Sequence, residues 1–120
     1  MTPFNLNLYS SNNNALFDKH NFSVNYMHSK LTELKQYSNP EIVSEKAHQL
    51  GLNQVHESSR KDKKYMVFDG NKMVHFGQMG FEDYTKHGDE KRRSNFRKRN
   101  HRWANSPVYS PAFLSYNLLW

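Results

Sequence analysis

The sequence contains no cysteine, and its apolar content is low. Without thiols the chain can form neither disulfide bonds nor a thiolate metal site, so its stability must come from packing or from partners. Hydrophobic residues make up only 36% of the 120 residues, a length that allows one domain with a modest core. The eight Phe, seven Tyr and two Trp must therefore supply much of that core.

The sequence also lacks a long apolar run. No stretch approaches the roughly 20 apolar residues that a membrane-spanning helix requires. Residues 1–17 have neither the basic start nor the continuous apolar segment of a secretory signal. We therefore expect neither membrane insertion nor export, which agrees with the lack of cysteine.

Acidic residues are too few to balance the basic ones. The sequence has 17 Lys and Arg against 11 Asp and Glu, which gives a net charge of +6. The excess lies between Arg60 and Arg102, where 13 basic residues accompany 6 acidic ones, whereas residues 1–59 have 4 basic and 5 acidic residues. Such a basic block indicates an anionic partner, either nucleic acid or an acidic protein surface.

Residues 1–38 are rich in Asn and show no sustained hydrophobic period before Met27. We expect an extended arm here, with a short helix at 27–36, ahead of a folded domain over 39–120. Aromatic side chains of the arm could fill pockets on a partner, and the alternative is a disordered tail. The candidate anchors are Phe4, Tyr9, Phe17 and Phe22.

Turn and capping residues predict the elements of the domain. Asn39 as N-cap and Pro40 at the first position begin a helix, and Gly51 ends it. The Asp69-Gly70 pair between two β-prone runs predicts a hairpin that pairs residues 65–68 with 72–76. Val55 is a candidate for a third strand.

The last third of the sequence predicts two more helices. Asp89 can cap a basic helix over 89–103, in which Phe96 and Trp103 lie seven residues apart and share one face. Ser110 and Pro111 begin an apolar helix over 111–120. The predicted fold class is α+β, with a β-hairpin or three-stranded sheet packed against about three short helices and preceded by the arm.

Residues 58–120 carry a series of unusual short motifs in a fixed order. These are Ser59-Arg60-Lys61-Asp62-Lys63-Lys64-Tyr65-Met66-Val67, Val74-His75-Phe76-Gly77, Phe81-Glu82-Asp83-Tyr84-Thr85-Lys86-His87, Asp89-Glu90-Lys91-Arg92-Arg93, Phe96-Arg97-Lys98-Arg99-Asn100, Ser110-Pro111-Ala112-Phe113-Leu114-Ser115-Tyr116 and Leu118-Leu119-Trp120. In these motifs the chain resembles a family of small uncharacterised proteins of nucleocytoplasmic large DNA viruses, with relatives in some phages. The resemblance implies a viral origin and assigns no activity. Relatives usually have a basic residue after the histidine that corresponds to His87, whereas this chain has Gly88. The resemblance therefore does not extend to a charge-dependent role of that turn.

Two basic segments are candidate binding sites for an anion or a protein partner. The first segment lies on the predicted helix and comprises Lys91, Arg92, Arg93, Arg97, Lys98, Arg99, Arg102 and Trp103. Arginine suits bidentate phosphate contacts and Trp103 could stack on a base; alternatively the helix is anchored by its aromatic residues while its arginines pair with nearby acids. The second segment comprises Arg60, Lys61, Lys63 and Lys64, which could equally be a solvated strand edge.

The sequence gives little support for catalysis. His75, His87 and His101 lack the spacing of helical metal-binding motifs, and no Gly-x-Ser-x-Gly element is present. We therefore expect no metal, no cofactor and no enzymatic activity.

The hypothesis we favour is a virion structural protein, such as a minor capsid component. It would bind capsid subunits through its arm and basic face, in the virion and in the host cytoplasm during assembly. The alternative is a protein that binds DNA or RNA through helix 89–103.

Overall fold

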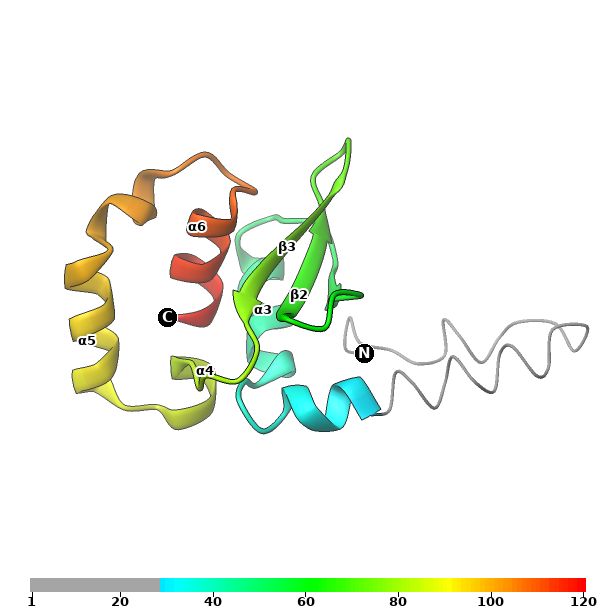
Figure 1. Ribbon diagram of the computed structural model, residues 1–120. Coiled ribbons are helices and arrows are strands. Elements are labelled where there is room, and N and C mark those ends of the chain that lie inside the picture. Colours follow the sequence, from blue (N-terminus) through cyan, green and yellow to red (C-terminus); the bar gives the residue numbers. More distant parts are fainter. Residues whose placement is uncertain (1–28) are drawn as a thin grey trace, which may run out of the picture.

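The computed structural model describes residues 29–120 and confirms the predicted α+β class. Its centre is an antiparallel sheet in the order β1-β2-β3, formed by Val55–Glu57, Lys63–Phe68 and Met73–Gln78 (Figure 1). Besides the helical residues 29–34, the helical elements are α3 (Pro40–Gln49), α4 (Tyr84–His87), α5 (Glu90–Arg99), η2 (His101–Asn105), α6 (Pro111–Leu114) and η3 (Ser115–Leu119). Within residues 29–120, none of the helices combines the length and apolar character that a membrane crossing requires.

The hairpin forms at the predicted Asp69-Gly70 turn, and its second strand begins at Met73, one residue later than predicted. Tyr65 pairs with Phe76 and Phe68 pairs with Met73. Asp69 closes the connection because its Oδ1 atom accepts hydrogen bonds from the backbone N–H groups of Asn71 and Lys72, at 2.7 and 2.8 Å. The same bonds lower the pKa of the Asp69 carboxyl, which therefore stays ionised as a turn-forming acceptor.

Helix α3 begins and ends where its capping residues predict. The Asn39 side chain accepts from the N–H groups of Glu41 and Ile42, and Pro40 occupies the first turn. At the other end Gly51 has a φ of +72°, and the N–H of Leu52 donates to the carbonyl of Ala47. This left-handed termination returns Leu52 to the core, where it packs on the buried cluster.

The helices differ in how closely they pack against the sheet and the core. α6 packs against β3, and α3 contacts both β1 and η3. Figure 1 shows α5 on the far side of the C-terminal helical segment, away from the sheet. The core lies between the sheet and its neighbouring helices and is formed by Leu34, Val43, Ala47, Val55, Tyr65, Val67, Val74, Phe76, Met79, Leu114, Leu118 and Leu119. α5 contributes no buried residue to it.

The boundary predicted for the arm is too late in the chain. Residues 29–34 are helical, within the short helix predicted at 27–36, and Leu34 is fully buried in the core. Lys30 is buried as well, and its ammonium donates to the carbonyls of Arg60 and Lys63 at 2.8 and 2.7 Å. Residues 29–38 therefore belong to the folded body, while Phe4, Tyr9, Phe17 and Phe22 lie outside the described residues.

Neither of the two later helices is a single regular α-helix. The α-helical part of the basic segment ends at Arg99, and Asn100 follows as its C-cap, with both its backbone N–H and its side-chain amide donating to the Phe96 carbonyl. Arg102 and Trp103 consequently lie on the 3-10 turn η2. The C-terminal segment widens into a π-helical turn over η3, where the Asn117 side-chain amide donates a hydrogen bond to the Phe113 carbonyl.

Gly77 is the glycine at which a side chain should cost the most. Its φ is +82°, and a Cβ atom there would lie 3.0 Å from Leu119 and 3.1 Å from Lys64 Cβ. We expect Gly77→Ala to lower the free energy of unfolding by about 2–3 kcal/mol, through backbone strain plus overpacking. Gly80→Ala is the matched control, since its φ is +100° with open space around it. Urea unfolding should give equal losses for both variants only if the close packing at Gly77 contributes nothing.

Candidate functional site

The basic helix α5 has a fixed N-terminus. Asp89 Oδ1 accepts from the N–H groups of Arg92 and Lys91, at 3.1 and 2.9 Å. These bonds lower the pKa of the Asp89 carboxyl, so the cap is charged at neutral pH. Tyr84, on α4, donates from its hydroxyl to the Glu90 carboxylate and ties the first turn of α5 to the body.

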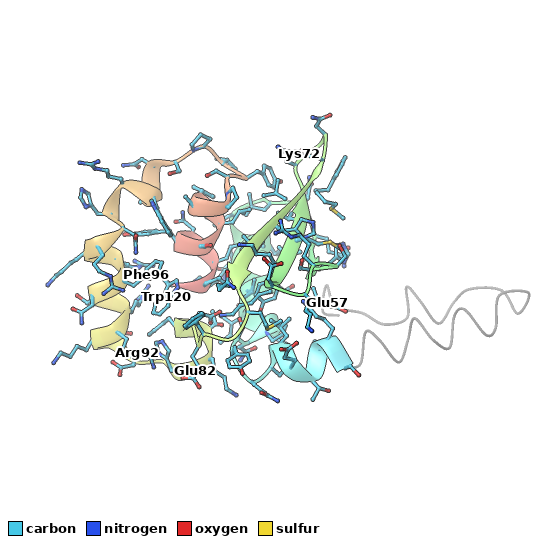
Figure 2. The ribbon with its side chains drawn as sticks, viewed as in Figure 1. Glu57, Lys72, Glu82, Arg92, Phe96 and Trp120 are labelled. Carbon is cyan, nitrogen blue, oxygen red and sulfur yellow. The ribbon has the colours of Figure 1, made fainter. Side chains whose placement is uncertain are left out.

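An aromatic cluster attaches α5 to the rest of the fold. Phe96 stacks on Trp120, with ring centroids 4.3 Å apart and planes within 6° of parallel, and Figure 2 shows the two side chains meeting between α5 and the C-terminal segment. Trp103 packs edge-on against Phe96 at 5.9 Å, as their shared face predicts. His87 and Tyr116 complete the cluster beside these rings. A helix without a buried residue is thus held by ring contacts.

Two of the predicted binding arginines turn inward. Arg93 and Arg97 donate to the main-chain oxygen of Trp120, at 2.7 and 3.0 Å. Their guanidinium groups also lie over the rings of Tyr84 and Tyr116, at 4.7 and 5.2 Å. Arg93 and Arg97 therefore anchor the helix, and their charges are directed mainly into the fold.

The other predicted cations remain at the surface. Lys91, Lys98 and Arg99 on α5 and Arg102 on η2 are exposed and form no ion pair with any residue of 29–120. We call these four residues the basic face. Arg92 is also exposed but lies 3.6 Å from Glu82, at the end of α5 where Figure 2 labels both residues.

A groove of about 540 Å³ lies on the aromatic side of α5, opposite Lys91 and Lys98, and meets the basic face only at η2, where Arg102 precedes the lining residue Trp103. It lies between the end of β3, the loop before α4, the aromatic side of α5 and η2, and α6 with η3. Its lining is mainly apolar and consists of Lys63, Lys64, Phe76, Gly77, Gln78, Phe81, Glu82, Asp83, Phe96, Trp103, Pro111, Ala112, Ser115, Leu119 and Trp120. We call it the aromatic groove. At its rim Phe81 is 69% exposed and Trp103 is 37% exposed.

The second predicted basic segment does not act as a unit. Arg60 forms an exposed ion pair with Asp62 at 3.3 Å, Lys61 is exposed, and Lys63 lines the aromatic groove. The prediction that Lys64 is available to a partner is wrong. Its side chain is only 3% exposed, and its ammonium lies 3.0 Å from the buried carboxylate of Asp83.

Lys64 and Asp83 are the centre of a buried polar network that joins β2 to α4. The Lys64 ammonium also donates to the Phe81 carbonyl at 2.6 Å, and Thr85 donates to Asp83. Ser38 lies between Thr85 and the Tyr65 hydroxyl, which donates to it at 2.6 Å. Burial raises the pKa of Tyr65 well above its ordinary value, and burial lowers that of Lys64 against the opposing effect of Asp83. The buried polar groups of this network satisfy one another's hydrogen bonds, so the network holds β2 and α4 together.

The histidines do not come together. His87 packs on Trp120, His101 is exposed near the Lys98 carbonyl, and His75 contacts Ser58 through Nδ1 at 2.7 Å. The pKa of the His75 imidazole is lowered, chiefly by partial burial and next by the positive charge of Arg60. The Ser58 side chain is buried, so the pair cannot present a nucleophile to a substrate. Among the described residues no three His, Asp or Glu side chains converge on a position for a metal ion.

Sequence patterns did not indicate the aromatic groove. Phe81 is an isolated aromatic residue in a polar turn, preceded by Gly80 and followed by Glu82. The only signal was that a bulky apolar residue occurs where neither helical nor strand periodicity can bury it. The groove forms from segments distant in the sequence, which single-sequence periodicity does not relate.

Comparison with known proteins gives a family without an assigned function. Residues 54–100, from β1 through α5, match the model of a family of unknown function (DUF5754). That family description names neither an activity nor a viral source. No curated protein and no solved structure matches the chain.

Proposed function

We propose that this protein is a non-enzymatic structural component that binds an acidic surface of a neighbouring protein through its basic face. The proposal rests on Lys91, Lys98, Arg99 and Arg102, which are exposed and have no ion-pair partner within 29–120. The segment that carries them is held in place by stacked rings and by Arg93 and Arg97. Because the helix is already anchored to the fold, its backbone need not become ordered when the charges meet a complementary surface.

The neighbouring aromatic groove favours a protein over a nucleic acid as the partner. Protein interfaces are enriched in aromatic and arginine side chains around an apolar centre. Phe81 and Trp103 are exposed at the groove, whose lining also includes Leu119 and Pro111, and Arg102 is the neighbour of Trp103 in the chain. Apolar anchors and positive charge thus meet at η2.

The resemblance to viral proteins suggests the setting of this interaction. We propose that the partner is another virion protein, with a capsid subunit as the first candidate, and that the protein is a minor capsid or virion-associated component. It would occupy the virion, and the host cytoplasm during assembly. The proposed docking role of Phe4, Tyr9, Phe17 and Phe22 remains a prediction, since they lie outside the described residues.

Nucleic acid is the second candidate partner. It is favoured by the spacing of Lys91 and Lys98, which are two helical turns apart on the exposed side of α5, with Arg99 and Arg102 nearby. Such a row of cations can follow a phosphate backbone. Trp103 is exposed enough to contact a base.

Removal of three cations tests the proposed function. We expect Lys91, Lys98 and Arg99 changed together to Gln to weaken binding of the full chain to poly-L-glutamate at least about tenfold in low salt. The matched control changes Lys35, Lys72 and Lys86 to Gln, which removes the same charge from exposed positions elsewhere. It should change binding less than about twofold.

Fluorescence anisotropy over a series of salt concentrations provides the measurement. The proposal is wrong if both triple variants lose affinity equally, because net charge alone would then explain the binding. Single-stranded DNA of matched total charge separates the two candidate partners. Binding to DNA that is tighter than to polyglutamate, with a steep salt dependence lost only in the α5 variant, would assign the site to nucleic acid.

A further inference from the structure

The aromatic groove has the features of a pocket for side chains from another protein. Phe81 is the most exposed large apolar residue of the described chain, at 69%, and stands at the rim with Trp103. The groove volume of about 540 Å³ exceeds what one bulky side chain would fill. Its walls come from β3, α5, η2 and the C-terminal segment, all of which are fixed by core or ring contacts.

The charges around the groove indicate which kind of segment it would accept. Lys64 and Asp83 neutralise each other in the wall, and Arg92 offsets Glu82 at the rim. Lys63 in the lining and Arg102 next to Trp103 remain without an ion-pair partner within 29–120. The apolar pocket is therefore bordered by uncompensated positive charge, which complements an acidic ligand.

We propose that the aromatic groove binds a segment of a partner protein in which adjacent bulky apolar residues are flanked by Asp or Glu. The apolar side chains enter between Phe81, Phe96 and Trp103, and the acidic flanks meet Lys63 and Arg102. This inference rests on the proposed function and adds to it the sequence character of the partner. The segment supplies the apolar anchors, and Lys63 and Arg102 supply orientation and specificity.

A peptide titration of the full ¹⁵N-labelled chain tests the pocket. The probe is an unlabelled peptide with Phe and Leu side by side, flanked on both sides by glutamates. One comparison peptide has serines in place of Phe and Leu, and another has lysines in place of the glutamates. The two tryptophans of the chain, Trp103 and Trp120, both line the groove, so their indole N–H signals report its occupation directly.

The probe should shift both indole signals, and the lysine-flanked peptide should shift neither. Phe81→Ala should weaken probe binding by at least about tenfold, as expected of an interface anchor. Val108→Ala is the matched control, because Val108 is 57% exposed and borders a different cavity. It should change the affinity less than about twofold.

Failure of the groove can be distinguished from failure of the basic face. If the serine peptide binds as tightly as the probe and shifts only amide signals of α5, the basic face still binds acids and the groove inference is overturned. Unchanged affinity in Phe81→Ala also overturns it. Sedimentation that shows a dimer of the wild type and a monomer of Phe81→Ala would assign the groove to a second copy of this chain, again contradicting the proposal.

Discussion

Replacing Asp83 with leucine is expected to lower the free energy of unfolding by about 3–5 kcal/mol, because it leaves the Lys64 ammonium charged and buried without its partner. The two groups lie 3.0 Å apart, and their side chains are 3% and 2% exposed. Thr85 would lose an acceptor as well. Urea unfolding of the full chain, followed by far-UV circular dichroism, measures the loss.

The double variant Lys64→Met with Asp83→Leu provides the control for this experiment. It removes both charges and fills the space with apolar groups of similar size, so it should recover most of the stability. A double variant as unstable as Asp83→Leu alone would show that the single loss comes from packing, not from the unpaired ammonium.

Replacing Phe96 with alanine should destabilise the protein by about 2–3 kcal/mol, although Phe96 lies on the most polar helix. Its ring stacks on Trp120 and contacts Trp103 and Tyr116, so truncation removes the centre of the aromatic cluster. Hydrogen exchange should then show faster opening of α5 than of β2 and β3, because the helix has no buried residue to hold it.

Phe68→Ala is the matched control for the loss of a phenyl ring. Phe68 is 45% exposed in β2, so its truncation should cost less than about 1 kcal/mol. Uniform destabilisation of α5 and the sheet in Phe96→Ala, with no selective opening of the helix, would contradict the anchoring role assigned to the aromatic cluster.

Local signals in the sequence predicted the elements whose boundaries depend on neighbouring residues. Asn39 and Gly51 define α3, Asp69 closes the hairpin, and Asp89 begins α5, because each acts through hydrogen bonds or φ values within a few positions. The shared face of Phe96 and Trp103 was likewise a consequence of helical spacing.

Features that depend on distant contacts were not predictable in this way. Lys64 is the last of five successive charged residues, and only the fold places Asp83 beside it. Arg93 and Arg97 are indistinguishable in the sequence from the exposed cations, yet both reach the Trp120 carbonyl. Leu34 lies in the short helix predicted at 27–36, but the sequence does not show that this helix packs on the core and not on a partner.

The most direct test of the proposed function is carbodiimide cross-linking of purified virions, followed by mass spectrometry of the linked peptides. Carbodiimide joins a lysine amine to a carboxylate only where the two are in contact, so it detects the pairing that we propose for the basic face. We expect Lys91 and Lys98 to become linked to Asp or Glu residues of a second virion protein. Links from these lysines only to acids of this chain, such as Glu82 or Glu90, or absence of the protein from the particles, would contradict it.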